Sequence, residues 1–315
     1  MKRTPKSSTL GDLSENQSMF GPVFRFAPSP NGYLHLGHAA SALINQRLAQ
    51  EAGGRLLLRI EDIDLGRSRE DYVDAVYEDL AWIGVAWEQP VLRQSLNFAA
   101  YRRAADKLVD MGLLYKCFAT RAEISAAAAG AGGGFDPDGA PVYPGLHRNM
   151  SAAEVERRTA EGEPFAMRLD MAKACMLSRQ RAGGEINWRE MDEFGKTEIV
   201  TADPMAWGDV IIQRKDVPTS YHLSVVVDDA CQGVSHIVRG QDLRAATSIH
   251  RVLQLLLGLP DPMYRHHGLV RDESGRKLSK SDAATSLRSL RQAGWSLADV
   301  IQSLALKDLQ RSCCK

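Results

Sequence analysis

The sequence predicts an α/β protein built on a Rossmann-like, doubly wound parallel sheet, with a small inserted subdomain and short C-terminal helices. Short apolar runs alternate with amphipathic helical periods, and glycines follow these periods. One apolar run, RLLLRI at residues 55–60, is continuous. Alternating strands and helices are typical of a parallel sheet with crossover helices. A continuous apolar run is typical of a strand that is buried on both faces.

The first half of this core is expected at residues 21–115. Residues 1–20 are polar and rich in serine and lysine, so we expect a disordered lead-in. Prolines break the first strand, and Gly53, Gly84 and Gly112 end the three helices. The expected elements are a strand at 23–27, a helix from about residue 37, a strand at 55–60 and helices near 69–83 and 95–111.

The second half of the core is expected at residues 206–282, after an inserted subdomain at 116–205. The insert contains a stretch rich in alanine, glycine and proline at 125–145, which predicts a flexible loop. Residues 283–315 are long enough for two C-terminal helices. The second half is expected to hold a helix through residue 229, a strand at 234–238, a helix at about 242–257 and a last strand at 264–270.

The composition indicates a globular protein of a reducing compartment. Five cysteines are present without a CxxC pair, so we expect no disulfide framework. No apolar run approaches 18 residues, and we therefore expect a cytoplasmic protein that contacts no membrane. We also expect it to act as a monomer, although no feature of the sequence specifies the oligomeric state. Lys+Arg and Asp+Glu both number 39, giving zero formal net charge. A nucleic-acid partner would therefore have to bind at a local basic patch.

The first segment that could form a functional site is RFAPSPNGYLHLGHA at residues 25–39. It predicts a strand, a turn and then a helix that begins near His35 and His38. A helix N-terminus at the carboxyl end of a parallel strand can hold phosphate, because its free N–H groups and dipole point at the ligand. Gly37 would allow a nucleotide to approach the backbone. The alternatives are a metal-binding histidine pair or two surface histidines near a cap.

Two further segments carry charge at places where open α/β sheets bind ligands. RIEDIDLGR at residues 59–67 sets Glu61, Asp62 and Asp64 just past a buried strand. These carboxylates could be magnesium ligands, an acid/base pair or the acidic first turn of a helix. GRKLSKS at residues 275–281 follows the last core strand. Its lysines could neutralise charge on a leaving group, or the loop could simply be solvated.

Together these motifs resemble those of class I aminoacyl-tRNA synthetases in the form found in glutamyl-tRNA synthetases. RFAPSP and HLGH resemble the HIGH region, RIEDID the RIEDTD motif, and KLSKS the KMSKS loop. The resemblance implies ATP with Mg²⁺ and glutamate as substrates. It implies glutamate binding by Arg25, Ala27, Ser29, Glu61, Tyr221 and Arg239, with Glu61 holding the α-amino group. It implies ATP binding by His35, Gly37, His38, Gly240, Gln241, Asp242, Leu243 and Lys280, with His35, His38, Lys277 and Lys280 catalytic.

The chain departs from the family pattern at two places. Val225 stands where the family often has asparagine, so part of the usual glutamate contact set is missing. The family often binds zinc through Cys-x-Cys followed by Tyr and Cys. Here Cys117 matches the first ligand, Ala119 occupies the place of the second, and Tyr143 and His147 fall in the other two places. The remaining candidates predict a poor tetrahedral zinc site.

Only 34 residues follow Ser281, fewer than the anticodon-binding region of a conventional family member requires. Among relatives, this pattern resembles a shortened branch that activates glutamate without tRNA and esterifies it to queuosine at the wobble position of tRNA(Asp). Two other readings stay open. One is a shortened conventional glutamyl-tRNA synthetase that charges a tRNA 3′ end. The other is a catalytically idle paralogue that binds RNA.

Overall fold

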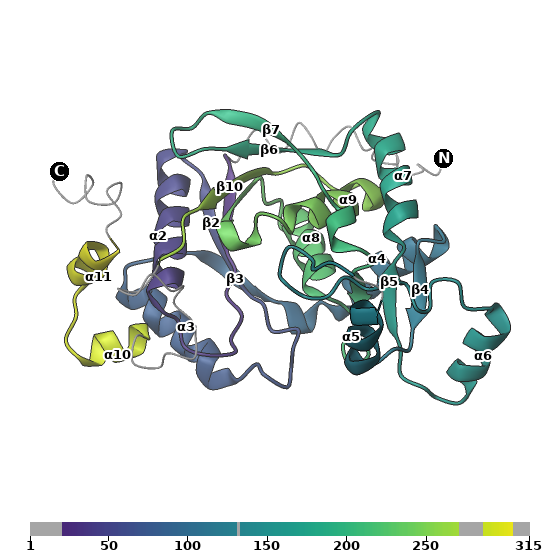
Figure 1. The fold of residues 1–315 in the computed structure, drawn as a ribbon. Coiled ribbons are helices and arrows are strands. Elements are labelled where there is room, and N and C mark those ends of the chain that lie inside the picture. Colours follow the sequence, from purple (N-terminus) through teal and green to yellow (C-terminus); the bar gives the residue numbers. More distant parts are fainter. Residues whose placement is uncertain (1–20, 131–132, 271–285, 305–315) are drawn as a thin grey trace, which may run out of the picture.

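The computed structural model describes residues 21–130, 133–270 and 286–304, and the statements below concern these ranges. Its core is a sheet of parallel strands (Figure 1). Strand β1 (Val23–Phe26) pairs with β2 (Arg55–Ile60), and β2 pairs with β3 (Glu88–Arg93). Strands β9 (His236–Gly240) and β10 (Met263–His267) also pair in parallel.

The two groups of strands meet between β1 and β9. The Ser235 N–H donates to the Val23 carbonyl oxygen at 3.0 Å, and the Ser235 hydroxyl accepts from the Val23 N–H at 2.8 Å. The parallel strands therefore lie in the order β3-β2-β1-β9-β10. This order reverses direction between β1 and β9, where doubly wound sheets open a crevice for ligands.

Helices cover both faces of the sheet (Figure 1). On one face, α2 and α3 pack against Phe24, Leu56 and Leu58. On the other face, α8 carries Asp229 to two arginines that project from β1 and β2. This arrangement confirms the predicted Rossmann-like fold. The helices of these layers are α2 (Leu36–Glu51), α3 (Glu70–Trp82), α8 (Tyr221–Cys231) and α9 (Thr247–Leu257). Two further helices, α4 (Phe98–Asp110) and α7 (Met171–Ala182), pack against α8 and α9.

The segment at 116–205 does not form one separate sheet. Strands β4 (Leu114–Cys117), β5 (Ala166–Leu169) and β8 (Ile211–Gln213) form a small antiparallel sheet of their own. The hairpin of β6 (Asn187–Met191) and β7 (Thr197–Thr201) instead extends the main sheet, because β6 pairs with β10. The boundary expected after residue 205 therefore does not follow the sheets.

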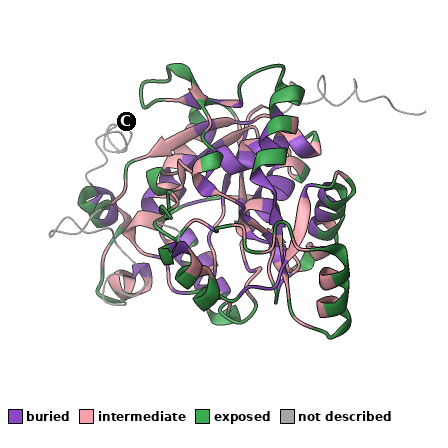
Figure 2. Ribbon diagram, turned by 45° about the vertical axis from the view of Figure 1, so that its right-hand side comes forward, coloured by how far each residue is buried: buried purple, intermediate pink, exposed green. Residues whose placement is uncertain are grey.

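The loop expected at 125–145 is wrong for its first residues, because α5 (Arg121–Gly130) is helical. A run of alanines is a good helix former, and glycines begin only where the helix ends. Helix α6 (Ala152–Ala160) follows, and none of its residues is buried. Figure 2 shows the contrast between the buried centre of the molecule and its exposed outer helices.

Two short helices, α10 (Leu287–Gln292) and α11 (Leu297–Ser303), follow the last core strand, as expected for residues 283–315. Leu287 and Val300 are buried and pack with the α2 and α3 side of the core. No helix among the described residues is long and apolar enough to cross a membrane.

Candidate active site

A cavity of about 620 Å³ opens at the carboxyl ends of the parallel strands. It contains every residue that the sequence predicted for substrate binding within the described ranges, except Gln241. Lys277 and Lys280 lie outside the described residues. The predicted residues that line the cavity are Arg25, Ala27, Ser29, His35, Gly37, His38, Glu61, Tyr221, Arg239, Gly240, Asp242 and Leu243.

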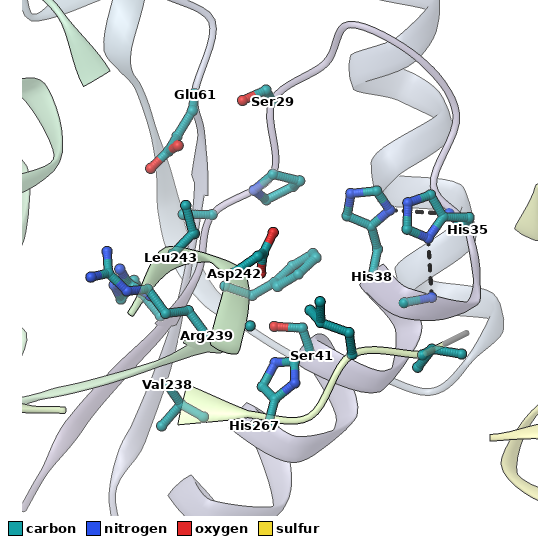
Figure 3. A pocket seen from close by; sticks show the side chains of 18 of the residues that line it. Ser29, His35, His38, Ser41, Glu61, Val238, Arg239, Asp242, Leu243 and His267 are labelled. Carbon is teal, nitrogen blue, oxygen red and sulfur yellow. Dashed lines mark hydrogen bonds between the residues drawn. The ribbon is translucent and has the colours of Figure 1, made fainter. Parts of the chain in front are cut away.

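One end of the cavity is formed by the start of helix α2. His35 is the N-cap residue, and its Nδ1 accepts a hydrogen bond from the Gly37 N–H at 3.1 Å. His38 Nδ1 accepts from the His35 N–H at 3.2 Å, which completes a capping box. The two rings lie 3.9 Å apart between centroids (Figure 3). Because Nδ1 is an acceptor in both neutral rings, the proton of each is on Nε2.

If His35 acts at the phosphates as its motif predicts, Gly37→Ala is expected to lower the rate of adenylate formation about a hundredfold, because a 1 Å misplacement of a catalytic group has an effect of this size. A Cβ atom at residue 37 would lie 2.9 Å from His35 Cε1 and 3.1 Å from His35 Nδ1, so the ring must move. ATP–pyrophosphate exchange measures the effect. Gly66→Ala is the matched control, because its Cβ would meet only Asp64 Oδ1 at 3.7 Å. Equal activity of the two variants would contradict the prediction.

The wall of the cavity after strand β9 also needs a glycine. A Cβ atom at Gly240 would collide with the Asp242 carboxylate and lie 3.2 Å from Leu269 Cδ2. The turn η4 (Gln241–Leu243) follows directly, and it brings Asp242 and Leu243 to the cavity wall. The absence of a side chain at residue 240 therefore allows this turn to pack closely against the strand.

A buried group of charges lies behind the opposite end of the cavity, where Arg25 and Glu61 form part of the wall. Asp229 Oδ1 accepts from Arg25 Nε at 3.1 Å and pairs with Arg59 Nη1 at 2.8 Å. Burial by itself raises the pKa of Asp229, but the two guanidinium groups hold this pKa below its usual value. Arg59 Nη2 lies 3.5 Å from Glu61 Oε1, and burial raises the pKa of Glu61 despite that neighbour. Arg59 is completely buried, so these contacts fix its place.

Arg239 lies on the same side of the cavity as Glu61, away from His35 and His38 (Figure 3). Its side chain is buried, with 5% exposed, yet it forms no ion pair with any carboxylate of the described residues. Four of its five N–H groups are engaged by neutral partners. The partners are Thr247 Oγ1 at 2.7 Å, His250 Nδ1 at 3.2 Å, and Tyr221 Oη and His266 Nε2 at 3.3 Å.

Three histidines surround this arginine and stay uncharged at neutral pH. Burial is the largest cause, and the positive charge of Arg239 adds to it. Together they lower the pKa of His222 to about 4, and they lower the pKa of His250 and His266 as well. Arg239 therefore remains the one positive group of this cluster, and a buried unpaired cation attracts an anionic ligand.

The stability of the protein is expected to fall on acidification, with His222 responsible for part of the loss. Between pH 6.5 and pH 4 the unfolded chain binds a proton at His222, whereas the folded chain does not. The free energy of unfolding therefore rises with pH in this window. We expect a share of about 1 to 2 kcal/mol between pH 5 and pH 7, since partial exposure screens the full shift. Urea unfolding of the wild type and His222→Gln tests this, and equal pH slopes would exclude it.

Sequence reasoning missed several residues of the site. Ser41 lies one helical turn after Gly37, a spacing that could have indicated it. His250, His266 and Thr247 had no motif to mark them, because they reach Arg239 only through the packing of α9 and β10. The additional residues that line the cavity are Phe26, Pro28, Ser41, Val238, His267, Gly268, Leu269 and Val270.

The candidate zinc ligands come together but do not fit a zinc ion. Cys117 Sγ donates to Tyr143 Oη at 3.4 Å. His147 Nδ1 accepts from the backbone N–H groups of Phe118 and Ala119 at 3.1 and 3.3 Å, so its lone pair is already used. The described residues contain no group of three or more His, Cys, Asp or Glu side chains suited to a metal. The cluster is held by these hydrogen bonds and by apolar packing.

Removal of divalent metals is therefore expected to leave the melting temperature unchanged. A structural zinc ion contributes folding energy directly, so a chelator would lower the melting temperature of a zinc-dependent protein. Differential scanning fluorimetry with and without EDTA makes the measurement. A lower melting temperature that added zinc restores would contradict this prediction.

Solved structures share this fold and define the class. The structure of a glutamate tRNA ligase from Elizabethkingia meningosepticum in complex with its amino acid matches with a TM-score of 0.67 and 26% identity. The match covers 87% of this chain and 53% of that one, so the chain spans about half of it. Methionyl-tRNA synthetase of Mycobacterium tuberculosis shares the fold at a TM-score of 0.53 and 10% identity. The class is therefore that of class I aminoacyl-tRNA synthetase cores.

Residues 23–310 match the family model described as tRNA synthetases class I (E and Q), catalytic domain, and the chain belongs to this family. The chain is 43% identical to the glutamyl-Q tRNA(Asp) synthetase of Rhodobacter capsulatus, over 90% of this chain and 100% of that protein. It is 39% identical to the protein of the same name from Nocardia farcinica, over 90% and 84%. The glutamate–tRNA ligase of Nostoc punctiforme is 32% identical, over 90% of this chain and 56% of that protein.

Proposed function

We propose that this chain is a ligase that activates glutamate with ATP, without need for tRNA, and transfers it to queuosine at the wobble position of tRNA(Asp). The observation that carries the proposal is the buried Arg239, which has no carboxylate partner among the described residues and faces the same cavity as Glu61. A substrate with one carboxylate at each end and an ammonium group fits this pattern of charge. The protein is proposed to act as a cytoplasmic monomer.

The glutamate side chain is proposed to bind beside Arg239. One N–H of its Nη2 is not used by the described partners. Tyr221 Oη accepts from Arg239, so its own proton is available to a ligand. An N–H and an O–H would then converge on the γ-carboxylate, which is a charge-assisted arrangement. Glu61 receives the substrate ammonium in this proposal, with Arg25, Ala27 and Ser29 completing the wall.

The activation step is a displacement at the α-phosphate of ATP. The α-carboxylate oxygen of glutamate forms a bond to phosphorus, the bond to the β-phosphate oxygen breaks, and pyrophosphate leaves. The Nε2–H groups of His35 and His38 are proposed to donate to phosphate oxygens as negative charge grows, as preorganised donors do. Mg²⁺ bound to ATP would supply charge neutralisation at the phosphates. Lys277 and Lys280, outside the described residues, retain their predicted role at the leaving group.

The acceptor step is supported by the relatives that carry the name glutamyl-Q tRNA(Asp) synthetase. The identity to three of them is 43%, 39% and 35%, against 32% and 33% for two proteins named glutamate–tRNA ligase. In the proposed transfer, a hydroxyl oxygen of queuosine forms a bond to the acyl carbon, the bond from that carbon to the phosphate oxygen breaks, AMP leaves, and the hydroxyl proton is released to solvent.

Transfer of labelled glutamate to two tRNA pools tests the whole proposal. One pool comes from cells that make queuosine and the other from cells that lack it. Label on the queuosine-containing pool alone is the expected result. Label on both pools would identify a conventional glutamyl-tRNA synthetase that charges 3′ ends. Absence of label together with absence of glutamate-dependent ATP–pyrophosphate exchange would identify a catalytically idle paralogue.

A further inference from the structure

Arg239 is linked to a carboxylate indirectly, through one histidine. His266 lies between Arg239 and Glu190: Arg239 Nε donates to His266 Nε2 at 3.3 Å, and His266 Nδ1 lies 2.9 Å from Glu190 Oε1. His266 is almost fully buried, with 1% of its side chain exposed, and Glu190 has 11% exposed. These distances are consistent with one neutral tautomer, which carries its proton on Nδ1 and accepts at Nε2.

The three residues come from three neighbouring strands of the main sheet. Arg239 on β9 is the register partner of His266 on β10, and β10 pairs with β6 at the Tyr264 and Glu190 positions. The β6–β7 hairpin therefore places Glu190 next to His266, which itself lies next to Arg239. The parallel register, rather than a flexible loop, holds the three side chains in line.

Glu190 is itself firmly held. Trp188 Nε1 donates to its Oε2 at 3.0 Å, and Arg244 Nε donates to its Oε1 at 3.0 Å. Burial opposes its ionisation, but the hydrogen bonds from His266, Arg244 and Trp188 lower its pKa to about 2. The carboxylate is therefore charged at neutral pH and can fix the proton of His266 on Nδ1.

We propose that Glu190 and His266 are positioning residues that orient Arg239 toward the substrate side chain while leaving its charge unpaired. This inference rests on the proposed function. A carboxylate in direct contact with Arg239 would compete with the γ-carboxylate of glutamate. An interposed neutral imidazole holds the orientation of Arg239, because its Nε2 accepts from Arg239 Nε without neutralising the guanidinium charge. The second N–H of Nη2, which none of the described partners uses, is then available to the substrate. The preference for glutamate over glutamine then depends on Glu190, a residue of the β6–β7 hairpin.

The test compares Glu190→Ala, Glu190→Gln and Glu198→Ala in glutamate-dependent ATP–pyrophosphate exchange. Glu198 is the cross-strand partner of Glu190 on the same hairpin, but its side chain is 63% exposed, so it controls for charge and hairpin stability. Glu190→Ala is expected to raise KM for glutamate about tenfold and to reduce the preference for glutamate over glutamine, with KM for ATP unchanged. Glu190→Gln is expected to keep most of the wild-type KM for glutamate and most of the preference for glutamate, since its amide oxygen can accept from His266 Nδ1. Glu198→Ala behaves as the wild type.

Unchanged KM for glutamate in Glu190→Ala, or an equal rise of KM for glutamate and ATP, would overturn the proposal. A second measurement does not depend on catalysis. The ¹⁵N chemical shifts of the His266 ring should report the Nδ1–H tautomer in the wild type and in Glu198→Ala, and its loss in Glu190→Ala. If the protein activated no glutamate but Glu190→Ala lost the Nδ1–H tautomer, the proposed function would fail. The relay, meaning the hydrogen-bonded series Glu190–His266–Arg239, would still hold. The same tautomer in all variants would exclude the relay.

Discussion

Replacing Arg239 with alanine is expected to lower kcat/KM for glutamate about a thousandfold, because removal of one partner of a buried, hydrogen-bonded charge pair weakens binding by about 4 kcal/mol. The substitution removes the positive charge that no carboxylate of the described residues neutralises. The neutral neighbours Thr247, His250 and Tyr221 cannot replace it. Glutamate and glutamine should then be used about equally.

Glutamate- and glutamine-dependent ATP–pyrophosphate exchange, each over a range of amino-acid concentrations, measures both effects. Arg189→Ala is a matched control, because Arg189 lies on the neighbouring hairpin with 47% of its side chain exposed. Its contacts are with Asp261, whose backbone oxygen accepts from Nη2 at 2.8 Å and whose carboxylate lies 3.6 Å from Nε. This variant should retain the wild-type preference. If Arg239→Ala kept a strong preference for glutamate, the γ-carboxylate contact would have to lie elsewhere in the cavity.

Replacing Asp229 with alanine is expected to lower the free energy of unfolding by about 4 kcal/mol, since a buried charge loses its partner. Asp229 joins Arg25 to Arg59, and the side chains of these three residues are at most 6% exposed. Without the carboxylate, two guanidinium groups face each other between the sheet and α8. Substrate binding should fail as well, because Arg25 lines the cavity.

Urea unfolding followed by circular dichroism gives the free energy for each variant. Glu51→Ala removes the exposed Arg47–Glu51 pair of helix α2 and should change the free energy of unfolding by less than about 0.5 kcal/mol. A similar small change in Asp229→Ala would mean that Arg25 and Arg59 find other partners. Both variants lose one carboxylate charge, so the difference between their free energies of unfolding measures the effect of burial.

Much of the site could be read from the sequence because it is built from local segments. The continuous run at 55–60 forms β2 over the predicted residues, and it is followed at once by Glu61. The HLGH segment forms the N-cap of α2, where His35 and His38 hold each other through bonds within four residues. Such contacts depend on neighbours in the chain, and the shared edge of a parallel sheet then brings the segments together.

Only the tertiary structure decided how Arg239 is surrounded. Its partners Thr247, His250 and His266 come from α9 and β10, and Glu190 reaches it through a hairpin 49 positions earlier that the sequence placed in a separate subdomain. The residues 187–201 have a local strand pattern, but the pattern does not specify which strand they pair with. Register between strands distant in sequence is set by the packing of both faces. The place of Arg239 at the end of β9 could therefore be predicted from a motif, whereas the contacts that surround its side chain depended on long-range strand pairing.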